Sequence, residues 1–189
     1  EKKIFCLKGP QLNTVNDFWR MIVEVGVEVV VMLTPLEENG KVKCQKYWSD
    51  KETLNINILE GSGSEDFLLI TLKGLQNSQE LTVTHLKYNS WPDLNVPENV
   101  GSLLNFQHVM QTLVNKINSG HSSTKVLTHC SAGVGRTGTF IALDHLIRQA
   151  VDVEAVDVYK CLKLLRSYRN HMIQAVVCVN VCVCVCVCV

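Results

Sequence analysis

The ten residues from His129 to Gly138, with the sequence HCSAGVGRTG, constrain what this chain can fold into more than any other stretch. The apolar and β-branched residues just before them, Val126 to Thr128, predict a short buried strand, and the apolar residues after them predict a helix. A glycine-bearing loop between a strand and a helix is a place where backbone N–H groups converge on an anion. We therefore expect an anion-binding loop here.

Two side chains give this loop a chemistry. Cys130 stands at its entrance and Arg136 at the first turn of the following helix, so the bend should bring both to one bound oxyanion. A thiolate at a helix N-terminus is stabilised by the positive end of the helix dipole. A guanidinium holds two oxygens of a phosphoryl group at once, which lysine cannot do. A lone cysteine is usually structural, but nucleophile, cation and loop in this order favour a phosphate-processing site.

The string HCSAGVGRTG resembles the phosphate-binding loop of the cysteine-based protein tyrosine phosphatases. The resemblance implies that Cys130 is the nucleophile and that Arg136 binds the phosphoryl group in the ground and transition states. It also implies that the Thr137 hydroxyl helps the thiolate leave and that His129 keeps the cysteine ionised. Substrate binding falls on the loop and its arginine, namely Ser131, Ala132, Gly133, Val134, Gly135 and Arg136.

A second loop, WPDLNVP over residues 91–97, is held between two prolines. A general acid that protonates the leaving oxygen contributes about 10²- to 10⁴-fold to such a reaction, and Asp93 is the carboxylate of this segment. An Asp after proline often only caps a turn. The loop resembles the mobile Trp-Pro-Asp loop of the phosphatases, which implies that Asp93 is the acid and later the base, with Trp91 in support. Leu94 and Asn95 depart from the usual family pattern, but Asn tolerates left-handed backbone angles, so we expect closure to be preserved.

Two further roles follow from the resemblance alone. The spacing from Glu38 to Cys44 matches the loop whose glutamate orients the catalytic arginine, although a charged turn is most often only solvated. Gln174 stands at the spacing of the glutamine that positions the hydrolytic water, although an isolated glutamine is normally a surface residue. The resemblance thus implies Glu38 as the partner of Arg136 and Gln174 as a catalytic residue.

The remaining pattern predicts one α/β domain, with a twisted mixed sheet flanked by helices as in the phosphatases, but incomplete. The continuous β-branched run at 29–33 predicts a strand buried on both faces. Alternating residues predict an antiparallel meander over 54–72 with a turn at 61–64, and a shift in apolar phase within 81–88 indicates a bulge. Helical periodicity predicts helices beginning near Thr14, Val100 and Asp157, the last with Cys161 in the core.

Charge and cysteine usage limit the kinds of partner and site to expect. The 18 basic side chains balance the 18 acidic ones, and no polybasic segment points to nucleic acid or a membrane surface. Four cysteines lie outside the last dozen residues and show neither metal nor disulfide spacing, as expected of reduced intracellular thiols; they are Cys6, Cys44, Cys130 and Cys161. We therefore expect no metal site among these four cysteines.

The resemblance covers nearly all of residues 4–175, so we interpret 1–175 as a partial phosphatase domain. The upstream loop whose tyrosine stacks on the substrate ring has no counterpart, and without that region we expect exposed apolar surface and low stability. Residues 176–189 alternate Val and Cys and match no packed element. Three interpretations of this tail are possible: a metal-binding tract, an aggregation-prone strand, or an in-frame translation of a GT repeat. We favour the translated repeat. The run is shorter than the roughly 20 residues of a membrane span.

The resemblance implies hydrolysis of phosphotyrosine in proteins through a phosphocysteine intermediate, without a metal or other cofactor. Its partners are then phosphotyrosine-containing proteins. The strings GTFIALDHLI and VDVY look most like single-domain receptor-type members, which implies a cytoplasmic domain whose link to a membrane is a parent receptor outside this chain. A catalytically weak phosphotyrosine-binding module and a fragment without function are the alternatives. A dual-specificity substrate range is disfavoured, because the Trp-Pro-Asp loop and KCQKYW resemble the tyrosine-specific branch.

Overall fold

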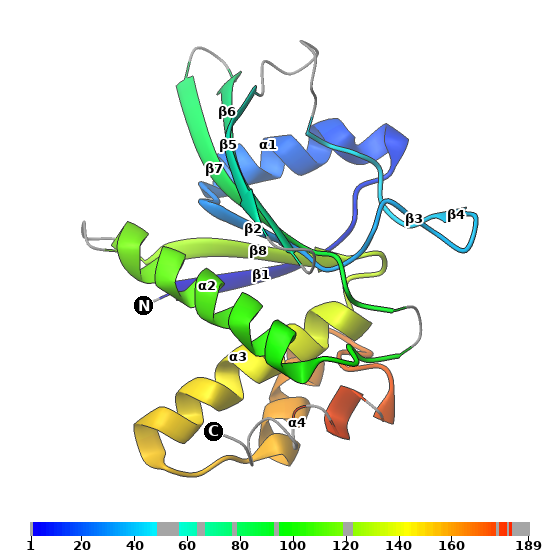
Figure 1. Ribbon diagram of the computed structural model, residues 1–189, viewed down its shortest axis with the longest axis vertical. Helices are drawn as coiled ribbons and strands as arrows, with labels where there is room; N and C mark the ends of the chain where they lie inside the picture. Colours follow the sequence, from blue (N-terminus) through cyan, green and yellow to red (C-terminus); the bar gives the residue numbers. More distant parts are fainter. Residues whose placement is uncertain are drawn as a thin grey trace.

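The computed structural model describes residues 2–48, 57–63, 67–76, 79–92, 95–118, 123–176, 178–180 and 182. Within this part of the chain a six-stranded sheet has the order β1-β8-β2-β7-β6-β5 (Figure 1). The strands are β1 (Lys2–Lys8), β2 (Val29–Met32), β5 (Asn57–Gly63), β6 (Phe67–Gln76), β7 (Gln79–Tyr88) and β8 (Thr124–Cys130). The first four in the sheet order run parallel, and β6 and β5 join them antiparallel. This confirms the predicted mixed sheet between helices.

The middle of the sheet is built from the β-branched run. All four residues of β2 are buried, and the strand lies between β8 and β7. A strand that is paired on both edges and covered on both faces needs apolar side chains at every position, which the sequence VVVM supplies. β8 is its parallel neighbour and delivers Cys130 to the end of the sheet.

Helices cover both faces of the sheet (Figure 1). α1 (Val15–Val25), preceded by the 3₁₀ turn Leu12–Thr14, lies on one face, while α2 (Val100–Asn118), α3 (Gly135–Val153) and α4 (Val158–Tyr168) lie on the other. Gly26, at φ 71°, ends α1 in the left-handed conformation that favours glycine. The Asp157 carboxylate accepts a 2.8 Å bond from the Lys160 amide and begins α4, at the predicted position.

Each face of the sheet has its own apolar core. Val29 and Val31 pack with residues of α2 and α3, whereas Val30 and Met32 pack with Phe18 and other residues of α1. Trp19 is 2% exposed and donates from its indole nitrogen to the Tyr47 carbonyl at 2.6 Å. This bond ties the segment after the short β3–β4 hairpin to α1. Strands β3 (Glu37–Glu38) and β4 (Lys41–Val42) form that hairpin, with the turn at Asn39 and Gly40.

Two predictions about the meander are wrong. Residues 61–63 are not a turn, because they continue β5 and pair with β6. Backbone hydrogen bonds to β6 hold this glycine-rich segment in the sheet although its small side chains pack weakly. Ser64 lies outside the described residues. β7 has no bulge, because its pairing with β6 is continuous, and the register shift lies in β5 between Ile58 and Glu60. The apolar phase of β7 misleads because Val83, His85 and Leu86 are all fully buried within a central strand.

A third apolar cluster involves the Val/Cys tail. Cys178 and Cys182 are buried and pack with Ala142, Leu146 and Cys161. The sequence predicted no packed element here, but the small apolar side chains of Cys178 and Cys182 pack against residues of α3 and α4 without a periodic pattern. The origin of the tail, and whether it is native structure, stay predictions.

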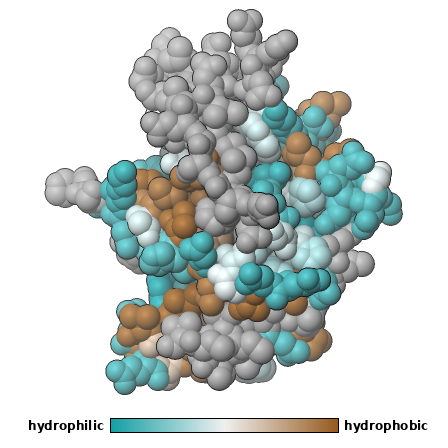
Figure 2. All heavy atoms as spheres, viewed as in Figure 1, coloured by the Kyte–Doolittle hydropathy of each residue, from teal (hydrophilic) through white to brown (hydrophobic). Residues whose placement is uncertain are grey.

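Exposed apolar side chains gather at the far end of α3, where Val151 and Val153 are 70% and 62% exposed. Figure 2 shows this hydrophobic area at the lower left, while the β3–β4 hairpin on the right is hydrophilic. None of the described helices is both long enough and apolar enough to span a bilayer.

Candidate active site

The loop between β8 and α3 has the geometry expected of an anion-binding loop. β8 ends at Cys130 and α3 begins at Gly135, so residues 131–134 form the turn. Gly133 adopts φ 74°, and a Cβ there would lie only 2.1 Å from the Leu7 carbonyl oxygen, so this position requires glycine. The Gly133 amide donates to Cys130 Sγ at 3.2 Å. The loop therefore turns a backbone N–H donor toward the sulfur.

Arg136 is held in place from three directions. Its Nη2 donates to both carboxylate oxygens of Glu38, at 2.9 and 3.0 Å, and Nη1 donates to Thr34 Oγ1 at 3.3 Å. Nη2 also donates to the Pro92 carbonyl at 3.1 Å. Lys43 Nζ lies 3.5 Å from the same Glu38 carboxylate. The hairpin thus places Glu38 against Arg136, and the arginine in turn contacts the loop that carries Asp93.

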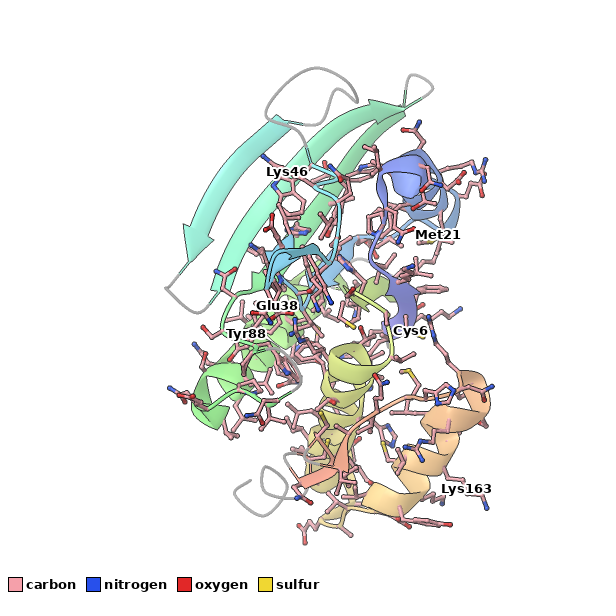
Figure 3. All side chains as sticks on the ribbon, turned by 90° about the vertical axis from the view of Figure 1, so that its right-hand side faces the viewer. Cys6, Met21, Glu38, Lys46, Tyr88 and Lys163 are labelled. Carbon is pink, nitrogen blue, oxygen red and sulfur yellow. The ribbon has the colours of Figure 1, made fainter. Side chains whose placement is uncertain are left out.

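The described ends of that loop are anchored. Trp91 is 2% exposed, packs edge-on against Tyr88 and donates from Nε1 to the Asn95 carbonyl at 3.0 Å. Asp93 and Leu94 lie outside the described residues. A neighbouring cavity of about 500 Å³ is lined by Glu38, Tyr88 and Trp91 among others, and Figure 3 shows Glu38 and Tyr88 on this side of the molecule.

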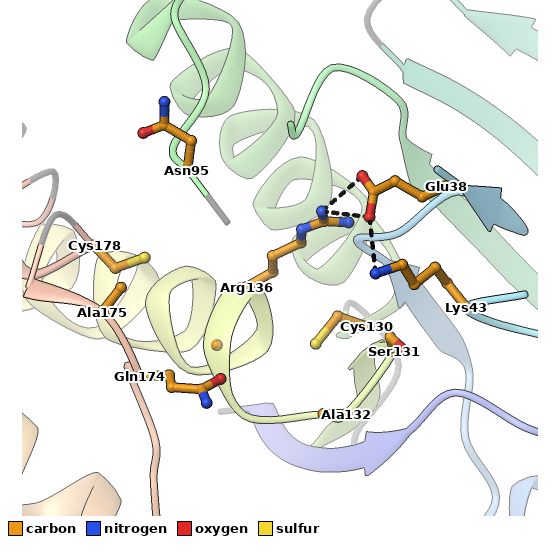
Figure 4. A pocket seen from close by; sticks show the side chains of 11 residues that line it. Glu38, Lys43, Asn95, Cys130, Ser131, Ala132, Arg136, Gln174, Ala175 and Cys178 are labelled. Atoms are coloured by element: carbon orange, nitrogen blue, oxygen red, sulfur yellow. Dashed lines mark hydrogen bonds and ion pairs between the residues drawn. The ribbon is translucent and has the colours of Figure 1, made fainter. Parts of the chain in front are cut away.

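One cavity of about 330 Å³ brings together most of the predicted site residues (Figure 4). Its lining residues are Glu38, Lys43, Asn95, Cys130, Ser131, Ala132, Gly135, Arg136, Gln174, Ala175 and Cys178. Gln174 reaches the loop, because a Cβ on Gly135 would lie 3.7 Å from Gln174 Oε1. Cys130 is 5% exposed, so its thiol is accessible mainly from this cavity.

Four predicted site residues do not line the cavity: Gly133 and Val134 belong to the loop itself, His129 to β8 and Thr137 to the first turn of α3. The Val134 carbonyl accepts from the amides of Gly138 and Ile173, both at 3.1 Å. Thr137 is fully buried, and within the described part of the chain its hydroxyl oxygen has no hydrogen-bond partner. Gly133 makes the turn, and His129 lies under the loop, fully buried. A fifth, Trp91, anchors the Trp-Pro-Asp loop.

His129 belongs to a buried polar group that the sequence analysis missed. Tyr47 Oη lies 2.8 Å from His129 Nε2 and 2.7 Å from His85 Nε2. Burial lowers the pKa of His129 to about 4 and the pKa of His85 to about 3, so both rings are neutral at pH 7. Burial likewise raises the pKa of Cys44 to about 12, with a smaller contribution from the nearby charge of Cys130. Tyr47, His85 and His129 come from distant segments, so no spacing in the sequence could have revealed that they meet.

Arg169 also supports the loop. Its Nη1 donates to the Cys6 carbonyl at 3.0 Å and its Nη2 to the Ala132 carbonyl at 3.1 Å. These bonds link β1, the anion-binding loop and the segment after α4. The Arg136 guanidinium and the Gly133 amide lie beside the Cys130 thiol, an arrangement with the chemistry to bind a tetrahedral oxyanion next to a thiol.

The family model for protein-tyrosine phosphatases matches residues 1–188 of the chain. The chain is 36% identical over 181 residues to receptor-type tyrosine-protein phosphatase eta of Mus musculus, and 36% identical over 190 residues to tyrosine-protein phosphatase 69D of Drosophila melanogaster. Phosphatidylinositol phosphatase PTPRQ of Homo sapiens is 36% identical over 179 residues. The alignments cover 92%, 92% and 91% of this chain but only 14%, 12% and 8% of those proteins, so the chain spans a small part of each.

Proposed function

This chain belongs to the protein-tyrosine phosphatase family, and from that premise we propose that it hydrolyses phosphotyrosine in proteins through a phosphocysteine intermediate. The observation that carries the proposal is that the Cys130 thiol, the Arg136 guanidinium and the backbone of the loop meet in one cavity of about 330 Å³. A tetrahedral phosphoryl group bound there has a nucleophile, a bidentate cation and N–H donors around it.

In the first step the Cys130 thiolate attacks phosphorus, so an S–P bond forms while the bond from phosphorus to the tyrosine oxygen breaks. Asp93 protonates the departing phenolic oxygen. Arg136 and the loop amides stabilise the charge on the equatorial oxygens, which is where electrostatic preorganisation contributes most. The bond from Arg136 to the Pro92 carbonyl supports this role for Asp93, because it links the cation to the residue just before the acid.

In the second step water attacks the phosphocysteine, the S–P bond breaks and inorganic phosphate leaves. Asp93, now a carboxylate, accepts a proton from the water, and Gln174 orients that water from the wall of the cavity. Thr137 donates its hydroxyl proton toward the departing thiolate. Its buried oxygen has no partner within the described residues, so no competing bond holds that proton elsewhere.

The charges in the cavity favour an aryl monophosphate over a phosphoinositide. Among the described lining residues the cationic side chains are Arg136 and Lys43, and both form ion pairs with Glu38. These three side chains together carry a net charge of about +1, which suits a single phosphate on a flat ring. A substrate with several phosphates needs further cations. The likeness to a phosphatidylinositol phosphatase makes phosphoinositides the second candidate.

The deciding experiment compares the two substrate classes on the 189-residue chain. Phosphate release from a phosphotyrosyl peptide and from a short-chain phosphatidylinositol phosphate is measured for the unsubstituted chain and for Cys130→Ser. We expect faster release from the peptide and none in Cys130→Ser. Retention of the peptide without turnover would instead support a binding module, and faster release from the lipid would reassign the substrate.

The proposal extends to the location of the domain in the cell. Relatives named as receptor-type phosphatases align with this chain over 92% of its length. We therefore place it on the cytoplasmic side of a membrane receptor, where phosphotyrosine-containing proteins are its partners. Fractionation of cells that express the complete protein tests this placement.

A further inference from the structure

We propose that His85 is a positioning residue for the reaction at Cys130, acting through Tyr47 to fix which ring nitrogen of His129 carries the proton. The kinetic consequence rests on the proposed phosphatase function, but the hydrogen-bond arrangement does not. No sequence pattern singled out His85, and it does not line the catalytic cavity.

The side chains of His85, Tyr47 and His129 form a buried row of hydrogen bonds that leads to Cys130. Tyr47 Oη lies 2.7 Å from His85 Nε2 and 2.8 Å from His129 Nε2. Tyr47 is 2% exposed and both histidines are fully buried, so water does not complete their hydrogen bonds. The other nitrogen of His129, Nδ1, lies 3.3 Å from the carbonyl oxygen of Cys130.

Counting protons selects one arrangement. A tyrosine hydroxyl has one proton to donate and two lone pairs that accept. Met32 Sδ lies 3.7 Å from Tyr47 Oη, but a thioether is a weak acceptor compared with a histidine nitrogen at 2.7 or 2.8 Å. The hydroxyl therefore donates to one histidine and accepts from the other. If His85 Nε2–H donates to Tyr47, the hydroxyl donates to His129 Nε2, and His129 Nδ1–H donates to the Cys130 carbonyl. Every N–H and O–H of these three side chains then has an acceptor, and among their polar atoms only the lone pair of His85 Nδ1 has no partner within the described residues.

The reverse arrangement is worse at both ends. The hydroxyl would donate to His85, and His85 Nδ1–H would then be a buried donor with no partner within the described residues. His129 Nδ1 would carry a lone pair facing the Cys130 carbonyl oxygen at 3.3 Å, an acceptor against an acceptor. A buried N–H without a partner is rarer and more costly than an unpaired acceptor. The geometry therefore favours the tautomer of His129 with the proton on Nδ1.

Protonation does not blur this choice near neutral pH. Among the described residues, the aromatic rings that contact the two histidines are Tyr47, Trp48 and Phe18. Burial lowers the pKa of His85, and the charges of His129 and Lys87 lower it further, so the ring carries one proton and must place it on one nitrogen.

The selected tautomer acts on the residue that carries the nucleophile. The Cys130 carbonyl accepts from the Gly9 amide at 2.8 Å and from His129 Nδ1–H. Two donors reduce the partial negative charge on the carbonyl nearest the thiolate and hold the last residue of β8 at the turn into the loop. Loss of the His129 donor should therefore make Cys130 less reactive.

The test uses two substitutions with matched controls. His85→Phe removes the donor, whereas His85→Gln keeps an N–H group near the position of Nε2. His108→Phe and His108→Gln are the controls, because His108 is exposed on α2. The readouts are the ¹⁵N NMR signature of the His129 tautomer, the rate at which iodoacetamide alkylates Cys130, and kcat on an aryl phosphate.

We expect the unsubstituted chain to show His129 protonated on Nδ1 and His85 on Nε2. His85→Phe should give mixed His129 tautomers and alkylation slowed about 3- to 10-fold, the effect of one hydrogen bond. His85→Gln should restore both, and the His108 variants should change neither.

An unsubstituted chain with His129 protonated on Nε2 would overturn the proposal, and this measurement needs no variant to fold. A single unchanged tautomer in His85→Phe would also overturn it. The predicted tautomers in a chain without phosphatase activity would contradict the proposed function alone.

Discussion

The ion pair between Glu38 and Arg136 sets the direction of the guanidinium that we propose binds phosphate. One nitrogen of the guanidinium bonds both carboxylate oxygens, which leaves the remaining N–H groups for Thr34, nearby carbonyls and substrate. Both side chains are 13% exposed, so solvent screens this pair less than a surface pair. The positions are 98 residues apart, and only the resemblance of the hairpin indicated that they meet.

Glu38→Gln should lower kcat/KM on an aryl phosphate by roughly 10- to 100-fold, because a hydrogen bond to a charged group contributes about 1.5–3 kcal/mol. The matched control is Glu37→Gln, at the exposed neighbouring position of the same strand. Steady-state kinetics on both variants separate a specific effect from a general one. Equal values for the two would show that Glu38 does not orient the arginine.

A comparison of substitutions at Gly133 and Gly40 distinguishes the cost of backbone strain from the cost of a steric contact. Both have φ near +70°, but a Cβ on Gly133 would meet the Leu7 carbonyl oxygen at 2.1 Å, while a Cβ on Gly40 meets nothing within 4 Å. Gly40→Ala should therefore cost only the conformational term of about 1–2 kcal/mol. Gly133→Ala should cost more and abolish turnover, because the loop must move away from Leu7.

Urea unfolding and activity assays on the two variants measure these effects. A Gly133→Ala chain as stable and active as Gly40→Ala would contradict the close approach of the loop to β1.

A buried ion pair joins β1 to the helices on the far side of the molecule from the hairpin. Lys2 Nζ lies 2.5 Å from Asp144 Oδ1, and the same carboxylate accepts from Gln107 at 3.0 Å and from Arg148 at 3.1 Å. Burial lowers the pKa of Lys2, and the Asp144 charge opposes that shift. The two residues are 142 positions apart. Their pairing depends on β1 lying beside β8, which the sequence did not reveal.

Asp144→Asn should destabilise the chain by roughly 3–5 kcal/mol, because it leaves the Lys2 charge buried without its counter-charge. Asp152→Asn is the control, since Asp152 is an exposed carboxylate on the same helix. Urea unfolding followed by circular dichroism compares the two. A similar small loss for both would mean that Lys2 is solvated and that the pair contributes little.

Across the whole molecule, the elements with a clear period were predictable and the contacts between them were not. β2 and α4 follow from their apolar runs and from the Asp157 cap, which are local signals. β7 misled because a central strand buries both faces, so its apolar phase carries no register information. Tyr47, His85 and His129 meet across 38 and 82 positions, and only the sheet order brings them together.

The two buried histidines make stability depend on pH. Their pKa values fall from a usual 6.5 to about 3 for His85 and about 4 for His129, so the unfolded chain binds protons that the folded chain does not. The stabilisation is complete above pH 6.5 and is lost as pH falls toward 4. The slope is about 1.4 kcal/mol per pH unit for each histidine.

Chemical denaturation between pH 7 and pH 4 measures this slope. His85→Gln should remove the share of one histidine, whereas the exposed His108→Gln should not change it. A slope unaffected by His85→Gln would contradict the buried, neutral state of that ring.

The central claim is that Cys130 carries the phosphoryl group between the two chemical steps. The most direct measurement is rapid acid quenching of the chain during turnover of a phosphotyrosyl peptide, followed by mass spectrometry of the peptide that contains Cys130. Gln174→Ala should increase the trapped fraction, because it slows attack by water on the intermediate. We predict a phosphoryl group on Cys130 in both proteins and none in Cys130→Ser. Peptide turnover that continues in Cys130→Ser would contradict this account.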